Sequence, residues 1–170
     1  MKKVIGFGEI MGRLAPQGFE RFSQSCPGRL DISFAGAEAN VAASVSMLGG
    51  RAAFVSALPG HAIADACVSS LKALDVDTGH IVRTGSGRLG LYFVETGANQ
   101  RPSNVVYDRA GSAVSLTPPE AYDWEAVFAD AGWLHLSGIT PALSRQAAEA
   151  AKVAATKAKA HGLTVSCDLN

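Results

Sequence analysis

Segments of strand length and segments of helical periodicity alternate along this chain, and this alternation limits the fold more than any other feature does. Residues 4–8 and 52–58 are short apolar runs, and residues 37–48 between them place small and apolar side chains three and four positions apart. Strands that alternate with helices pair in parallel, and the helices cover both faces of the sheet. The pattern therefore predicts an α/β fold on a parallel sheet with flanking helices.

The same alternation returns toward the end of the chain. We predict helices at residues 63–74, 123–129 and 145–161, and strands at 133–137 and 163–168. Ser144 is suited to cap the long helix at its start, and Gly162 is suited to end it.

The middle of the chain departs from this alternation. Residues 80–83, 89–95 and 104–109 are three strand candidates, joined by glycine-bearing loops with no helical period between them. We predict that they are consecutive antiparallel strands, which form a separate small sheet with the segments around 11–14 and 30–35.

Size and charge restrict the class of protein. With 170 residues the chain has room for about one domain. Its 15 basic and 15 acidic side chains balance, so it lacks the strong basic field that nucleic acids and anionic membranes attract. We expect neither a nucleic-acid nor a membrane partner.

The cysteines and the N-terminus indicate the compartment. Cys26, Cys67 and Cys167 are odd in number and widely separated, which argues against a disulfide scaffold or a zinc site. Glycines and Glu9 interrupt the first apolar run far short of a signal-peptide core. We expect a cytoplasmic protein.

Residues 85–90 match the pattern Gly-x-Gly-x-x-Gly. A dinucleotide-binding loop needs a helix after it, and a protein-kinase loop needs a lysine on the next strand. A strand candidate follows instead, and no lysine occurs between Lys72 and Lys152. We interpret this segment as a turn.

Residues 34–40 run from a strand through glycine into a helix. Gly36 allows the backbone to approach a ligand, and Asn40 lies in the first helical turn, where its amide can donate to a hydroxyl. A tight turn followed by an exposed asparagine is the alternative.

Tyr92, Tyr107 and Arg109 lie on two of the middle strands. Residues 107 and 109 share one face of a strand, so a phenol and a guanidinium point the same way, and arginine is suited to bind a carboxylate through two hydrogen bonds. A solvated arginine beside a half-buried tyrosine is the alternative.

Together these segments resemble the ribokinase-like (PfkB) carbohydrate kinases, and among them the 2-keto-3-deoxygluconate kinases. The resemblance spans essentially the whole chain. It is carried by Gly-Glu-Ile at 8–10, Ala-Gly-Ala-Glu-Ala-Asn-Val-Ala at 35–42, Gly-Leu-Tyr at 90–92, Tyr-Asp-Arg-Ala-Gly-Ser-Ala at 107–113 and His-Leu-Ser-Gly-Ile-Thr-Pro-Ala-Leu at 135–143. Ala35 departs from the family pattern, which usually has glycine there, and its methyl group is expected to crowd the sugar.

The resemblance implies a Rossmann-like ribokinase fold with a small antiparallel β-sheet lid made by residues of about 11–35 and 88–112. A sugar acid would lie between the two parts. The substrate-binding residues that it implies are Gly36, Ala37, Asn40, Tyr92, Tyr107, Arg109 and Ile139, with Arg109 near the acid carboxylate. Pairing of lids implies a homodimer or a higher homo-oligomer.

The resemblance also implies a reaction in which ATP, with Mg²⁺, phosphorylates a hydroxyl of the sugar acid, most closely 2-keto-3-deoxygluconate. Family members are about twice as long as this chain, and their catalytic aspartate and most of their nucleotide site belong to the second half. No catalytic residue is therefore assigned here; Asn170, in the family's Asp-x-Asn-x-Arg element, is assigned to the cofactor side. We expect this chain to be the N-terminal half of the domain and inactive alone.

Two alternatives remain. One is a fructokinase-type or ribokinase-type kinase of a neutral sugar, and the other is a truncated module that binds or pairs without catalysis.

Overall fold

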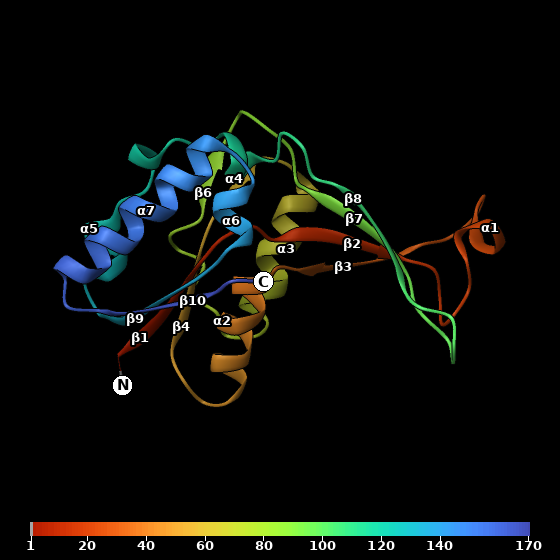
Figure 1. Cartoon of the computed structure of the whole chain (residues 1–170), viewed down its shortest axis with the longest axis horizontal. Coiled ribbons are helices and arrows are strands. Elements are labelled where there is room, and N and C mark those ends of the chain that lie inside the picture. Colours follow the sequence, from red (N-terminus) through yellow and green to blue (C-terminus); the bar gives the residue numbers. More distant parts are fainter. Residues whose placement is uncertain (1) are drawn as a thin grey trace.

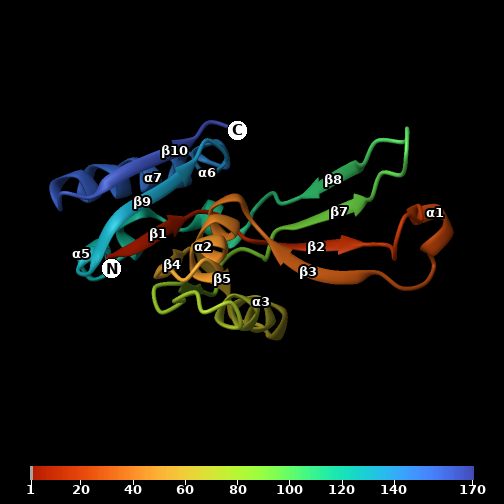
Figure 2. The ribbon, with the colours of Figure 1, turned by 90° about the horizontal axis from the view of Figure 1, so that it is seen from below.

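A computed structural model describes residues 2–170 of the chain. It has a body, in which helices pack on a parallel sheet, and a second sheet that extends away from the body (Figure 1). The view from below shows the same separation of the two parts (Figure 2).

The sheet of the body has four strands that are parallel throughout. Their order is β10 (Thr164–Asp168), β9 (Ala131–Ser137), β1 (Lys3–Phe7) and β4 (Ala52–Val55). Ile5 of β1 lies between Ala53 of β4 and Leu134 of β9. The parallel sheet expected from the strand–helix alternation is confirmed.

Helices cover both faces of this sheet. One face packs on α2 (Ala37–Met47) and α3 (Ala62–Lys72), and the other on α5 (Trp124–Phe128) and α7 (Arg145–Ala160). Successive side chains of a strand point to opposite faces, and so Val55 joins the core under α5 and α7 while Phe54 joins the core under α2 and α3. The described residues also form four short helices: α1 (Phe22–Ser25), α4 (Ala113–Leu116), η1 (Pro119–Ala121) and α6 (Ile139–Ala142).

The second sheet, called the small sheet below, contains β3 (Asp31–Ala35), β2 (Met11–Ala15), β7 (Leu91–Glu95) and β8 (Asn104–Asp108), in that order. The pairs β2–β3 and β7–β8 are antiparallel, but β2 and β7 run parallel. The expected small sheet and the antiparallel pairing of β7 with β8 are confirmed, but the sheet is mixed and not antiparallel throughout. Each hairpin is antiparallel because its strands are neighbours in the sequence, whereas the two hairpins meet in parallel.

The segment 80–83 does not belong to the small sheet, which corrects a second expectation. The strand there is β6 (Val82–Thr84), and it pairs in parallel with β5 (Ala57–Pro59). The apolar run 52–58 is split at Ser56, so that β4 and β5 are separate strands. The Val82 backbone N–H donates to the Ser56 carbonyl over 2.9 Å, and this bond attaches β6 to the body.

None of the helices in residues 2–170 combines the length and the apolar character that crossing a bilayer requires.

Candidate functional site

A cavity of about 170 Å³ lies where the small sheet meets the body. Its lining includes all seven residues that the sequence predicts for substrate binding: Gly36, Ala37, Asn40, Tyr92, Tyr107, Arg109 and Ile139. Four further residues line it, namely Glu9, Met11, Ala35 and Glu38. The structure thus brings together residues from β7, from the end of β8 and from the start of α2 and α6.

Gly36 joins β3 to α2 at a point where two backbone segments touch. A Cβ atom at this position would lie 2.0 Å from the carbonyl oxygen of Glu9, a distance that real side chains do not adopt. Only glycine therefore lets the start of α2 reach the wall of the cavity. Asn40, one turn into α2, is exposed and lines the same cavity.

Tyr92 and Tyr107 are direct cross-strand partners on β7 and β8. Their ring centroids are 5.9 Å apart, and the guanidinium carbon of Arg109 lies 5.5 Å from the centroid of the Tyr107 ring. This contact confirms that residues 107 and 109 share one face. Burial raises the pKa of the Tyr92 phenol, and this keeps the group neutral and able to donate a hydrogen bond.

Arg109 forms an ion pair with Glu9, in which Nη2 contacts the carboxylate oxygen Oε2. Glu9 follows β1 and its side chain is only 4% exposed, whereas that of Arg109 is 21% exposed. The pair therefore joins the body to the small sheet inside the cavity. The sequence did not predict a role for Glu9. A carboxylate directly after a buried first strand is the signal that could have identified it.

Glu38 is a second buried carboxylate that the sequence did not predict. Its Oε1 accepts hydrogen bonds from the Ser137 hydroxyl at 2.6 Å, the Ser137 N–H at 3.1 Å and the Thr140 hydroxyl at 2.8 Å. A Cβ atom on Gly8 would lie only 2.2 Å from Oε2 of Glu38. Glu38 thus ties α2 to the end of β9 and to α6.

Asn170 lies outside the cavity. It is exposed, and its backbone N–H donates to Oδ1 of Asp168 over 3.0 Å. Within residues 2–170 no group of three or more His, Cys, Asp or Glu side chains could hold a metal ion.

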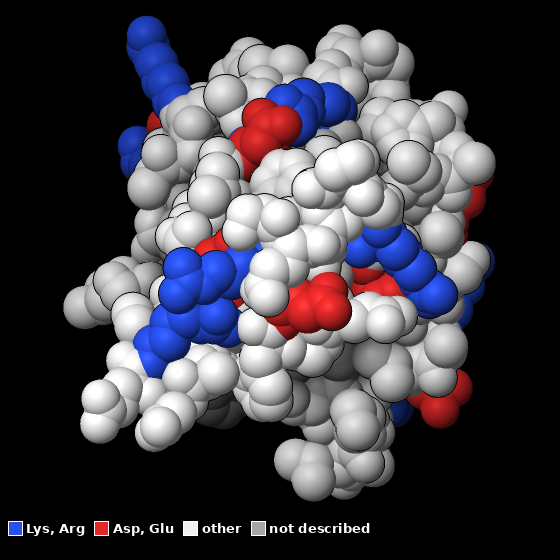
Figure 3. Space-filling model, turned by 90° about the vertical axis from the view of Figure 1, so that its right-hand side faces the viewer, with Lys and Arg blue, Asp and Glu red and all other residues white. Residues whose placement is uncertain are grey.

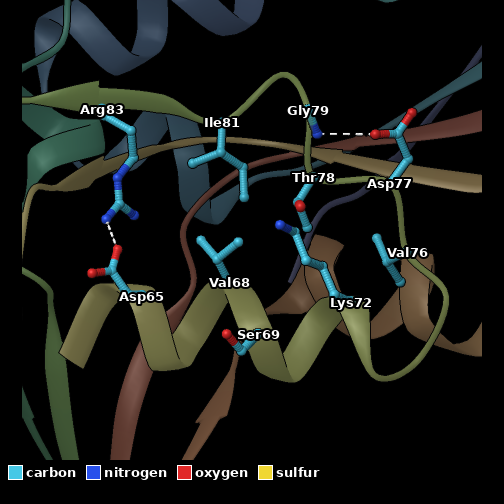
Figure 4. A pocket seen from close by; sticks show the side chains of 10 residues that line it. All are labelled: Asp65, Val68, Ser69, Lys72, Val76, Asp77, Thr78, Gly79, Ile81 and Arg83. Carbon is cyan, nitrogen blue, oxygen red and sulfur yellow. Dashed lines mark hydrogen bonds and ion pairs between the residues drawn. The ribbon is translucent and has the colours of Figure 1, made fainter. Parts of the chain in front are cut away.

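A larger groove of about 660 Å³ lies between α3 and the segment that leads into β6 (Figure 4). Arg83 is paired there with Asp65, and Asp77 accepts from the Gly79 N–H over 2.9 Å. Its carboxylates are thus already bound to partners of the chain. Figure 3 shows a similar mixing of charges on the face at the small-sheet end, where blue and red side chains lie next to one another. We therefore take the smaller cavity as the candidate site.

Comparison with known proteins indicates the family to which the chain belongs. A family model described as pfkB family carbohydrate kinase matches residues 1–170. The chain is 36% identical over 168 residues to the 2-dehydro-3-deoxygalactonokinase of Haloferax volcanii, which covers 99% of this chain and 52% of that protein. It is 29% identical over 136 residues to the 2-dehydro-3-deoxygluconokinase of Bacillus subtilis, which covers 80% of this chain and 42% of that protein.

Among solved structures, the 2-dehydro-3-deoxygluconokinase of Thermotoga maritima superposes with a TM-score of 0.95 and 46% sequence identity, over 100% of this chain and 51% of that one. The chain thus spans about half the length of such relatives or less.

Proposed function

Because this chain belongs to the pfkB family of carbohydrate kinases, we propose that the protein phosphorylates a sugar acid. The substrate is 2-keto-3-deoxygluconate, which the relatives' names write as 2-dehydro-3-deoxygluconate, or a close relative of it. The observation that carries the proposal is the cavity itself, since Arg109, two tyrosines, Gly36 and Asn40 all line it.

Each lining residue has a role that follows from its chemistry. Arg109 binds the carboxylate of the acid, because a guanidinium offers paired donors to two oxygens. Tyr92, Tyr107 and Asn40 donate to the keto and hydroxyl oxygens, and the backbone at Gly36 and Ala37 allows the sugar to approach closely. Ile139 forms an apolar floor. Residues 11–35 and 88–112 act as the lid over the sugar.

ATP would be the phosphoryl donor, and Mg²⁺ bound to it would neutralise the charge that develops on the transferred phosphate. No transfer step is assigned to the described residues. What they do is bind the acid, orient the acceptor hydroxyl and exclude water, and such positioning is a large part of phosphoryl-transfer catalysis.

Calorimetric titration of the chain with 2-keto-3-deoxygluconate and with D-fructose tests the proposal. In Arg109→Ala the affinity for the acid falls by at least about tenfold, the scale of a charged hydrogen bond, while the affinity for fructose changes little. Arg29→Ala is the matched control, because the Arg29 side chain is 78% exposed and pairs only with Asp31 among the described residues. Equal losses for both ligands would contradict the carboxylate role, and tighter binding of fructose by the unaltered chain would favour the neutral-sugar alternative.

We also propose that the protein forms a dimer through the small sheet. Ile32, Leu14, Phe93 and Val106 form an apolar row that crosses its four strands, and Ile32 and Val106 are each 51% exposed.

The free state of all three cysteines fits a reducing compartment such as the cytoplasm.

A further inference from the structure

The carboxylate of Glu9 is buried in the cavity with one partner. Oε2 forms the ion pair with Arg109, and Oε1 accepts no hydrogen bond from any residue of the range 2–170. Nε of Arg109 is buried and unpartnered as well. Two residues that line the same cavity thus each carry a buried polar atom without a partner among the described residues, an acceptor on Glu9 and a donor on Arg109.

An open acceptor of this kind is unusual in a protein interior. A buried polar atom without a partner costs about 1–3 kcal/mol, and more when it is charged, so nearly all such atoms are satisfied. Glu38 shows the ordinary arrangement in the same cavity, because its Oε1 accepts from three donors. Oε1 of Glu38 is thus held by three protein donors, whereas Oε1 of Glu9 has room for a donor from a ligand.

Gly90 keeps the neighbourhood of Oε1 open. A Cβ atom at position 90 would lie 2.9 Å from Oε1 of Glu9 and 3.4 Å from Cβ of Arg109. Any other residue at position 90 would press on the carboxylate and displace it. The glycine thus preserves the position of Glu9 beside Arg109.

We propose that Glu9 is a specificity-determining residue, whose Oε1 accepts a hydrogen bond from the C4 hydroxyl of the bound sugar acid. This inference rests on the proposed function, in which Arg109 holds the carboxylate. The two oxygens of Glu9 belong to one carboxyl group, so a hydroxyl on Oε1 lies close to whatever the guanidinium holds. In the open-chain acid C2 carries the keto group and C3 carries no hydroxyl, and C4 is therefore the first carbon that can supply the donor.

The C4 hydroxyl also distinguishes two closely related sugar acids. The gluco and galacto forms of the 2-keto-3-deoxy acid differ in configuration at C4 alone, and the two curated relatives are named for these two acids. A fixed acceptor at this carbon discriminates by geometry, because a misdirected hydroxyl leaves the buried oxygen unpaired.

The test measures dissociation constants by calorimetry for the acid, for its analogue without the 4-hydroxyl, and for its analogue without the 5-hydroxyl. We expect the unaltered chain to lose at least about tenfold in affinity when the 4-hydroxyl is absent, and Glu9→Ala to bind the acid and the 4-deoxy analogue equally. The effect of removing the 5-hydroxyl should be the same in both proteins. A merely structural role of Glu9 would weaken all three ligands alike.

Glu9→Gln provides a second variant that keeps the size of the side chain. Its amide oxygen turns to Arg109, so its NH₂ group faces the position of Oε1 and offers a donor in place of an acceptor. The ratio of the affinity for the acid to the affinity for its 4-deoxy analogue should again fall well below that of the unaltered chain. Asp108→Asn is the matched control. It also removes a carboxylate beside Arg109 in the sequence, but Asp108 pairs with Arg88 and does not line the cavity.

Circular dichroism establishes whether each variant is folded. If Glu9→Ala does not fold, Glu9→Gln alone tests the role of Glu9. An unaltered chain that binds the acid and its 4-deoxy analogue equally, or a folded Glu9 variant that keeps the full ratio, overturns this inference alone. An unaltered chain that does not bind the acid overturns the proposed function and this inference with it.

Discussion

At the scale of single residues, Glu38 helps to fix the geometry of the cavity, because it ties α2 to the end of β9 and to α6. Replacing it by alanine leaves the Ser137 and Thr140 hydroxyls and the Ser137 N–H buried without their acceptor. We expect Glu38→Ala to lower the free energy of unfolding by about 3 kcal/mol, as measured by urea denaturation. Glu38→Gln should lose less, because its amide oxygen still accepts.

Glu149→Ala is the matched control for this change, since Glu149 is exposed on α7 and has only Lys152, 3.9 Å away, as an ionic neighbour among the described residues. Its stability should stay within about 0.5 kcal/mol of the unaltered chain. A Glu38→Ala protein as stable as this control would show that the three hydrogen bonds contribute nothing to the fold.

The candidate site shows which residues a sequence can identify. Local rules predict the close backbone approach at Gly36 and the shared face of Tyr107 and Arg109, because glycine permits such an approach and alternate residues of a strand share a face. They did not lead to Glu9 or Glu38, although the place of Glu9 directly after a buried strand is a signal. Each is a single carboxylate in an ordinary turn or first helical turn, and what makes it a site residue is burial against distant segments.

At the scale of elements, the contact of β1 with the edge of its sheet should depend on pH. Burial by itself raises the pKa of Asp77, but the Gly79 N–H and the Lys3 ammonium, 2.9 Å from Oδ2, outweigh burial and lower the pKa below 3.8. A carboxyl group whose pKa is lower in the folded state stabilises the fold above its unfolded pKa, and that contribution is lost as the pH falls through the folded value.

We therefore expect the free energy of unfolding to fall below pH 3.8, and to fall less steeply in Asp77→Asn. Urea denaturation at a series of pH values between neutral and the acid range measures both slopes. Asp75→Asn is a control two residues away, because Asp75 forms no ion pair with another described residue. Identical slopes in Asp77→Asn and the unaltered chain would refute the assignment.

Most elements follow from local patterns, and the exceptions concern pairing. The helix predicted after Ser144 begins there, with Oγ of Ser144 accepting from the Ala147 N–H over 3.0 Å. Hydrophobic periodicity identifies a strand but not its partner, and this explains why β6 was assigned to the wrong sheet. The parallel contact of β2 with β7 joins segments about 80 residues apart, a distance over which no turn signal acts.

At the scale of the whole molecule, the small sheet has two faces of different character. Tyr92 and Tyr107 lie on the face that lines the cavity. The other face carries the apolar row of Ile32, Leu14, Phe93 and Val106. An apolar row of this kind is a common surface for association, and a second copy of the same sheet offers an equally apolar surface to it.

We expect Val106→Asp to weaken dimerisation by at least about tenfold, because the dimer would bury an unpaired charge. Val105→Asp is the matched control: the same substitution one residue earlier on β8 falls on the opposite face, and Val105 is 42% exposed. Sedimentation equilibrium over the micromolar range measures both dissociation constants. If the row forms the interface, Val106→Asp sediments as a monomer at concentrations where Val105→Asp and the unaltered chain are dimers. A monomeric unaltered chain, or equal weakening by both substitutions, would exclude this face as the site of association.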